Sequence, residues 1–261
     1  GFNFSVDYWT YEFEGRFTVL PVQAIAANVA PGGLDGTQLA DCNSPFSAFV
    51  VFAGGVCTQG TTIGNDISRI STQAVNGPDV TTSGLDFSVN YRDTLGPVRV
   101  SLGANATHTL EYEFGDFEFN GLLFSQGYDA AGFANYNRAP GTVSKWRASG
   151  YVNFQIDPVS LTWSSNYISG VDDNRCEGLQ FCAETPEFGG TNFGRRVDDF
   201  FVHDIFATLD LRLAGIEAEL QAGVENVFDT DPPQARLEYS YDPFIGTAKG
   251  RTYKIGMKVR F

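Results

Sequence analysis

The sequence predicts an all-β protein, a transmembrane antiparallel β-barrel of about eight strands with long extracellular loops. The first observation is that apolar and polar residues alternate with a period of two in segment after segment, whereas no stretch keeps a helical period over several turns. The second is that the connections between these segments alternate between short turns and long loops. The third is the lack of any apolar run of about 18 residues, which excludes a transmembrane helix.

The first three strands follow from this alternation. In the segment 2–13, one face of the strand is apolar and carries Phe2, Phe4, Val6 and Tyr8. The next segment alternates from Leu85 up to Arg92, and a turn at 93–97 leads into a third segment at 98–107. In each segment the interleaved positions are polar, as expected for strands with one apolar and one wet face.

Five further segments show the same pattern. They lie at 145–156, 161–167, 201–213, 216–224 and 253–261. The tight turn Asp157-Pro158 joins the first two of these, and Ala214-Gly215 joins the next pair. Many of the eight segments approach the roughly 9–11 residues that a tilted strand needs to cross a bilayer.

The connections distinguish a membrane barrel from a soluble sandwich. Short turns are expected at 93–97, 157–159 and 214–216, and long loops at about 14–67, 114–142, 169–198 and 229–250. A soluble sandwich shows the same alternation of residues, but it does not usually gather every long loop at one end. Outer-membrane barrels have short periplasmic turns and long extracellular loops, and the charged interleaved face suits a wet lumen.

Composition argues against two classes of function. The chain has 17 Lys and Arg residues against 31 Asp and Glu residues, so its net charge of −14 would repel nucleic acid. The only two histidines, His108 and His203, both fall in predicted strands. His203 adjoins Asp204, but neighbours in a strand point to opposite faces and cannot form a catalytic dyad. We therefore expect neither a nucleic-acid-binding protein nor an enzyme.

Four cysteines fall in two local pairs, Cys42 with Cys57 and Cys176 with Cys182. Neither pair has the C-x₂-C spacing of a zinc site or a nearby histidine. Four cysteines allow three connectivities, and short loop closure favours pairing within each loop. Both pairs are predicted to be disulfides in extracellular loops, which indicates an oxidising compartment.

An acidic loop at 169–199 contains a possible calcium site. Asp172, Asp173 and Glu177 offer the hard oxygen ligands that Ca²⁺ prefers. Their spacing is not that of a defined calcium loop, so the preferred interpretation is a solvated acidic loop. No other metal or cofactor is expected.

A second loop is rich in aromatic and amide side chains that could contact a ligand. The candidates are Phe124, Tyr128, Asn135, Tyr136, Asn137 and Arg138. Aromatic rings with adjacent amides suit a sugar or a flat organic ligand. Packing of the loop on itself and anchoring at the lipid interface explain the same residues.

The end of the chain carries the most specific motif. Lys254, Gly256, Val259 and the terminal Phe261 resemble the signal by which the outer-membrane assembly machinery recognises the last strand of a barrel. The stretch Gly-Val-Glu-Asn-Val-Phe-Asp-Thr-Asp-Pro-Pro at 223–233 is similar to the "N-L-F-D … P" element of TonB-dependent receptors. Gly84-Leu85-Asp86 resembles another strand of that family.

This resemblance implies a fold and a set of partners. Members have 22 strands around a plug, so residues 1–261 would be the C-terminal part of the barrel, about its last eight strands, with the plug and earlier strands outside them. The partners would be that remainder, on the same or a separate chain, the TonB complex acting through the plug, and outer-membrane lipid. The substrate would be a small molecule or an oligosaccharide, such as an iron-siderophore, a vitamin or a sugar, taken up by a Gram-negative bacterium. The loops would be extracellular and the C-terminus periplasmic.

The alternative is a self-contained eight-stranded barrel with a structural or adhesive role. Small residues recur on the inward face, which would leave so narrow a barrel poorly filled: Ser5, Ser88, Ser101, Gly103, Ser149 and Gly223. The two hypotheses differ at the sheet edges. The small barrel requires 2–13 to pair with 251–261, whereas the receptor requires both segments to pair with strands outside this sequence.

Overall fold

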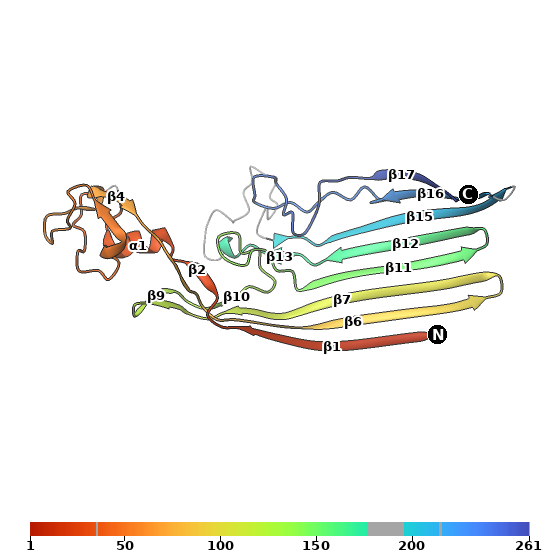
Figure 1. The fold of residues 1–261 in the computed structure, drawn as a ribbon, viewed down its shortest axis with the longest axis horizontal. Helices are drawn as coiled ribbons and strands as arrows, with labels where there is room; N and C mark the ends of the chain where they lie inside the picture. Colours follow the sequence, from red (N-terminus) through yellow and green to blue (C-terminus); the bar gives the residue numbers. More distant parts are fainter. Residues whose placement is uncertain (35, 177–195, 214–215, 261) are drawn as a thin grey trace. The chain divides into compact units, whose positions relative to one another are not determined.

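The computed structural model of the chain describes residues 1–34, 36–176, 196–213 and 216–260. Its main sheet follows the order of the sequence (Figure 1). The eight strands along it are β1 (Phe2–Phe13), β6 (Val80–Leu95), β7 (Val98–Phe114), β11 (Trp146–Ile156), β12 (Val159–Ile168), β15 (Phe200–Leu213), β16 (Ile216–Glu225) and β17 (Thr252–Arg260). A short strand, β10 (Tyr128–Asp129), also pairs with β7. The predicted strands and their order are confirmed.

Two strands are longer than predicted. β6 begins at Val80 instead of near Leu85, and β7 continues to Phe114 instead of ending at Thr107. The additional residues of β7 keep the alternation, since Leu110, Tyr112 and Phe114 continue its apolar face. The first long connection therefore covers 14–79, and the next three cover 115–145, 169–199 and 226–251.

Strand register places side chains of one kind in rows across the sheet. Trp163 of β12 pairs with Val152 of β11 on one side and with Ile205 of β15 on the other. Ile205 in turn pairs with Val224, which pairs with Tyr253. These rows form one apolar face, and the interleaved residues form a polar face. This arrangement is the alternation expected of a sheet with lipid on one side and water on the other.

On the polar face, three aromatic side chains lie over glycines of the neighbouring strand. A Cβ atom built on Gly84 would stand 2.3 Å from the indole of Trp9, and one on Gly103 would stand 2.6 Å from the ring of Tyr151. The register partner of Gly223 is Phe206, whose ring would stand 2.3 Å from such a Cβ. The space that we expected Gly103 and Gly223 to leave open is thus filled by aromatic rings.

The sheet has two open edges. β1 and β17 lie at opposite ends of the strand order, and within the described residues they do not pair with each other. Ile255 on the edge strand β17 is 91% exposed. The prediction that 2–13 and 251–261 do not close against each other is confirmed, and the structure is a partial barrel.

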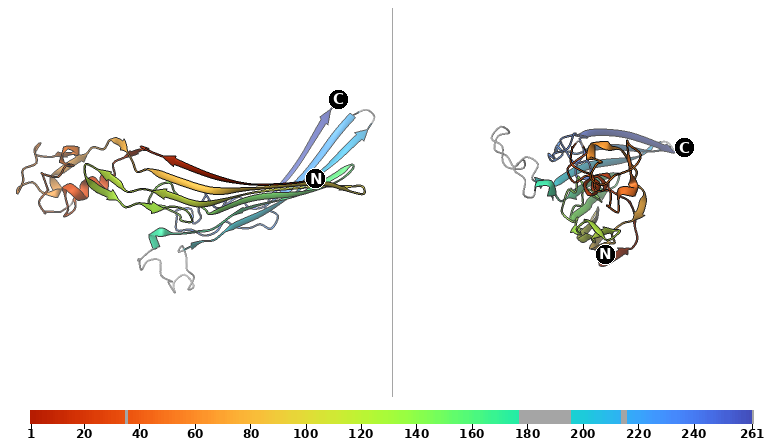
Figure 2. Two further views of the ribbon diagram at one scale, coloured as in Figure 1. Left: turned by 90° about the horizontal axis from the view of Figure 1, so that it is seen from below. Right: turned by 90° about the vertical axis from the view of Figure 1, so that its left-hand side faces the viewer.

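The chain divides into two compact units. The first comprises Gly1–Tyr11, Thr82–Tyr112 and Asp129–Phe261, and it contains most of the main sheet. Its loops hold β13 (Val171–Asp172), a 3₁₀ turn at Asn174–Cys176 and β14 (Arg196–Val197). Further views are given in Figure 2.

The second unit comprises Glu12–Thr81 and Glu113–Tyr128. Its elements are β2 (Phe17–Val19), α1 (Val22–Val29), 3₁₀ turns at Ser47–Phe49 and Gly64–Asp66, β3 (Val50–Phe52), β4 (Ile67–Ile70), β5 (Ala74–Asn76), β8 (Phe117–Phe119) and β9 (Leu122–Ser125). It has its own hydrophobic core around Phe46, which is fully buried with Leu20, Ile25 and Val29. Sequence analysis did not predict α1, because eight residues are too few turns to show a helical period. No helix of the described residues is long and apolar enough to span a membrane.

Candidate functional site

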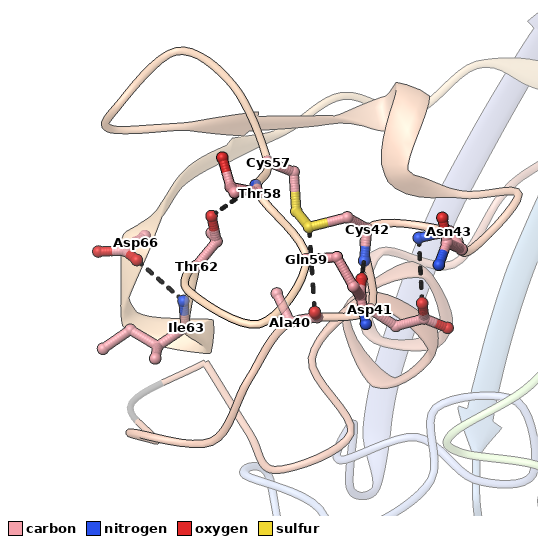
Figure 3. The surroundings of a disulfide bond; sticks show 10 residues. All are labelled: Ala40, Asp41, Cys42, Asn43, Cys57, Thr58, Gln59, Thr62, Ile63 and Asp66. Carbon is pink, nitrogen blue, oxygen red and sulfur yellow. Dashed lines mark hydrogen bonds between the residues drawn. A yellow bond between two sulfur atoms is a disulfide. The ribbon is translucent and has the colours of Figure 1, made fainter.

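A disulfide joins Cys42 and Cys57 in the second unit, with 5.5 Å between their Cα atoms (Figure 3). The surrounding turns are held by side chains, since the Cys42 amide donates to Oε1 of Gln59 at 2.9 Å and the Thr58 amide donates to Oγ1 of Thr62 at 2.8 Å. The first predicted disulfide is therefore confirmed. The second pair includes Cys182, which lies outside the described residues.

Two of the six predicted ligand-contacting residues lie in the second unit and pack there. The ring centroid of Phe124 lies 4.9 Å from that of Phe46, in an edge-on arrangement. The Tyr128 ring stacks on Phe114 at 4.9 Å, and the guanidinium of Arg16 lies 5.1 Å from the Phe114 ring. These contacts agree with the alternative in which the aromatic loop packs on itself. Ligand binding by Phe124 and Tyr128 remains a prediction.

The other four candidates lie in the loops of the first unit, where Asn135 organises a turn. Asn135 is 1% exposed, and its Nδ2 donates to the carbonyl oxygens of Ala130, Phe133 and Gly141 at 3.0 to 3.1 Å. Its Oδ1 accepts from Nε of Arg138 at 3.0 Å. Because a buried amide with satisfied partners fixes local backbone geometry, Asn135 acts here as a structural residue.

Tyr136 connects two of the long loops. Its hydroxyl donates to Oδ2 of Asp242 at 2.9 Å, and Asp242 has no exposed surface. Asp242 also accepts from the hydroxyl of Thr142 and from the amide of Phe244. Burial, and then the negative charge of Asp242, raise the pKa of the Tyr136 hydroxyl far above its usual value. The guanidinium of Arg175 lies 4.7 Å from the Tyr136 ring and adds the third long loop to this cluster.

The predicted calcium ligands have arginine partners. Asp173 accepts from Nε of Arg175 at 2.9 Å and from Nη2 at 2.6 Å, and the Asp173 side chain is fully buried. The hydrogen bonds that Arg175 donates to Asp173 raise the pKa of Arg175 above its usual value. Asp172 pairs with Arg196 at 3.1 Å. Glu177 lies outside the described residues, and within them no group of three or more His, Cys, Asp or Glu side chains could hold a metal.

Apolar packing reinforces this junction of the three loops. Five apolar side chains of these loops are at most 1% exposed: Ala134, Val171, Val197, Ala235 and Ile245. Asn174, whose Oδ1 accepts from the amide of Asn135 at 3.0 Å, also lies against Asn137, the remaining candidate of the aromatic loop. The three long loops of the first unit therefore form one connected cluster.

A polar hollow of about 310 Å³ lies on the polar face below these loops. Its floor is one row of the sheet, because Ser149 pairs with Asn105 on one side and with Asn166 on the other. All three side chains are exposed and lack a hydrogen-bond partner among the described residues. Arg147, one step closer to the loops, donates from Nη2 to the carbonyl oxygen of Phe244 at 3.0 Å. Such a row can hydrogen-bond a polar ligand.

Sequence analysis missed this row. The three residues come from three different strands, and only the register of those strands places them side by side. The alternation identifies the face on which each residue lies but not its level along the sheet.

Both histidines lie on the apolar face, where neither meets a carboxylate of the described residues. The His108 ring stacks on Trp146 at 4.1 Å, whereas His203 contacts Ser165 and Trp163. Asp204 lies on the opposite face, where its Oδ1 accepts from the amide of Asn226 at 2.8 Å. The prediction that His203 and Asp204 form no dyad agrees with this placement.

The motif at the end of β16 forms a closed turn. The Oδ1 of Asn226 accepts from the amide of Thr230 at 2.8 Å, and its Nδ2 donates to the Thr230 carbonyl at 2.9 Å. Both Asn226 and Asp229 have positive φ angles, near 51° and 57°. Asn and Asp tolerate this left-handed conformation better than most residues, which explains these residue types in the motif.

The residues of the assembly motif lie on β17. Lys254 forms an ion pair with Glu225, which also pairs with Lys249 at 2.7 Å. Gly256 is the register partner of Gln221, and Val259 that of Ala218. Phe261 lies outside the described residues. Recognition of this strand by the assembly machinery remains a prediction.

A comparison with protein families agrees with this architecture. The family model "TonB dependent receptor-like, beta-barrel" matches residues 1–227. Among solved structures, the chain is similar to the FrpB iron transporter from Neisseria meningitidis (F3-3 variant), with a TM-score of 0.45 and 18% identity. That similarity covers 73% of this chain and 25% of the transporter, so the chain spans about a quarter of its length. No curated protein matches the sequence.

Proposed function

Because the chain belongs to the family of TonB-dependent receptors, in their β-barrel part, we propose that its protein imports a scarce nutrient across the bacterial outer membrane. Members of this family are transporters and not enzymes. In this proposal the chain provides part of the barrel wall and its loops, and it performs no covalent chemistry. The observation that carries the proposal is the family match over residues 1–227 on an open sheet whose short and long connections alternate.

The proposal also assigns an orientation and partners. The short connections face the periplasm and the long loops face the exterior, as in other outer-membrane barrels. The plug and the remaining strands, on the same or another chain, complete the receptor, and the TonB complex acts through the plug. Substrates of the three expected classes, an iron-siderophore, a vitamin or an oligosaccharide, would meet first the loop cluster and then the polar hollow.

An uptake assay tests the proposal. Cells with and without the full-length protein are given a labelled ferric siderophore, cobalamin or an oligosaccharide, and each assay is repeated in cells without TonB. We expect uptake of one probe to fall to background in both deletions. If cells without the protein, or cells without TonB, take up all three probes as well as the parent cells do, the proposal is contradicted.

Variants of the polar hollow extend the same assay to the site. Asn105→Ala with Asn166→Ala removes two amides that have no partner within the described structure, so the barrel should assemble normally. We expect the KM for uptake to rise by about tenfold, the size of one or two lost hydrogen bonds. Thr208→Ala on the same face is the matched control, since it lies outside the residues that line the hollow. An unchanged KM in the double variant would exclude the hollow as a contact site.

A further inference from the structure

The polar hollow has a single charged side chain in its lining. Among the described residues that line it, Arg147 is charged, and the other polar side chains are neutral amides and hydroxyls. Arg147 is exposed and forms no ion pair within the described part of the chain. Because the chain has a net charge of −14, this arginine supplies a local positive charge for an anionic ligand that most of the protein would repel.

The guanidinium of Arg147 is held in place from the loop side. Its Nη2 donates to the carbonyl oxygen of Phe244 at 3.0 Å, and the Phe244 amide donates to Oδ1 of the buried Asp242 at 2.8 Å. A guanidinium has five N–H donors in a planar fork, and the described residues accept only this one hydrogen bond from it. A carboxylate is the group that such a fork binds with two parallel hydrogen bonds.

Thr107, the register partner of Arg147 on β7, can only accept a hydrogen bond from a ligand. Its hydroxyl donates to Oδ1 of Asp86 at 2.6 Å, and a hydroxyl has only one proton to donate. The Thr107 oxygen therefore suits a ligand hydroxyl, whereas the guanidinium suits a carboxylate. Since Cβ atoms of cross-strand partners lie roughly 4.5–5.5 Å apart, a ligand that meets both side chains carries its carboxylate and a free hydroxyl a few bonds from each other.

The remaining lining suits further hydroxyl groups. The next row of the sheet carries amides and a hydroxyl that both donate and accept: Asn105, Ser149 and Asn166. Ile168, the register partner of Arg147 on β12, adds an apolar contact for the C–H groups of a ring. One carboxylate, several free hydroxyls and a C–H surface are the groups of a sugar acid.

We propose that the polar hollow binds an acidic oligosaccharide, in which the carboxylate of a uronic acid unit accepts from Arg147 and a nearby hydroxyl donates to Thr107. This inference rests on the proposed import of a nutrient and selects one anionic substrate class for it. A hydroxycarboxylate chelate of iron also offers carboxylates. Its hydroxyl oxygen is bound to the metal, however, and has no proton for the Thr107 oxygen, so the site favours the sugar acid.

Titration calorimetry of the purified full-length protein tests this proposal. The probes are trigalacturonate, its fully methyl-esterified form, which has the same hydroxyls but no charge, and ferric citrate. We expect the Kd of trigalacturonate to be at least about tenfold lower than that of the ester, the size of a hydrogen bond to a charged group. Ferric citrate should bind more weakly than trigalacturonate and should not displace it.

Two variants separate the two contacts. Arg147→Gln should bind the acid and the ester equally, whereas Thr107→Val should weaken both by about fivefold and keep the preference for the acid. The matched control is Arg99→Gln, because Arg99 lies on the same face outside the hollow, where its Nη1 donates to Gln155 at 2.9 Å. It should bind as the parent does, and far-ultraviolet circular dichroism verifies that each variant has folded.

Three outcomes overturn the inference: equal affinity of the parent for acid and ester, a preference for the acid that survives in Arg147→Gln, and displacement of trigalacturonate by ferric citrate. An equal loss of both ligands in Arg147→Gln would likewise assign this residue a structural role only. The calorimetry needs neither TonB nor transport. Binding with the expected preference but without TonB-dependent uptake would therefore contradict the proposed import alone, whereas TonB-dependent uptake of another probe without this binding would contradict the inference alone.

Discussion

The polar residues of the loops show how single side chains hold long connections in place. Asp242 and Asp173 are both buried carboxylates, and each is surrounded by donors from another part of the chain or from its own turn. A buried carboxylate is stable only with such partners, since an unpaired charge in the interior is costly. Asp173 was predicted as a possible calcium ligand and Asp242 was not singled out. A sequence alone does not reveal which hydrogen-bond donors a carboxylate will meet in the fold.

Tyr136→Phe tests this cluster and its dependence on pH. The folded pKa of Tyr136 is raised above the unfolded value of about 10, so the stability it contributes is complete below pH ~10 and is lost as the pH rises further. Removing the hydroxyl should destabilise the loops at pH 7 by about 1.5 kcal/mol, the value of a hydrogen bond to a charged group. Hydrogen exchange of the Ala134 and Phe244 amides measures the change.

Above pH 10 the loops of the parent should lose protection more steeply than those of the variant, which has no phenol at this position to ionise. Tyr239→Phe is the control, because Tyr239 is 72% exposed and should change neither rate. Equal exchange in the parent and in Tyr136→Phe at pH 7 would show that the hydroxyl does not stabilise the cluster.

At the scale of elements, the main sheet was predictable and the second unit was not. Alternation is a local property, so eight strands and their order could be derived from the residues themselves. The core of the second unit combines residues 12–81 with residues 113–128, and the strands β6 and β7 lie between these two segments in the sequence. No local sequence pattern predicts that such separated segments pack together. The sequence singled out Phe124 as a possible ligand contact, but its packing against Phe46 was not foreseen.

The disulfide should stabilise this second unit. Replacing Cys42 and Cys57 by Ser together opens a loop with a sequence separation of 15, which is expected to cost about 3 kcal/mol of unfolding free energy. Limited proteolysis followed by mass spectrometry should show faster cleavage within 14–79 and unchanged cleavage within 226–251. Equal cleavage of 14–79 in the parent and the double variant would show that the core suffices without the disulfide.

At the scale of the whole molecule, the two open edges dominate. Unpaired backbone N–H and C=O groups cost several kcal/mol each in hydrocarbon, so β1 and β17 need partner strands in a membrane. The resemblance to TonB-dependent receptors, together with the cost of an open edge in hydrocarbon, allowed this conclusion from the sequence, but it did not identify the partner strands.

We predict that both edges are paired with other strands of the receptor in the full-length protein. The amides of β1 and β17 should then exchange as slowly as those of the interior strand β12, which is the internal reference. A protein with Phe4→Cys and Ile255→Cys provides the opposing test. Rapid formation of a disulfide between these positions would demonstrate a small closed barrel and exclude the larger one.

The three aromatic rings over glycines have a consequence for how far the polar face projects from the sheet. Trp9, Tyr151 and Phe206 lie across the neighbouring strands instead of standing upright, because Gly84, Gly103 and Gly223 leave room beneath them. The polar face is therefore lower at these three points than the bulk of the side chains suggests, and in the proposed receptor it would present flat ring surfaces to the lumen. A single added methyl group on any of the three glycines would displace a ring from the sheet and, in the proposed receptor, would narrow the lumen at that point.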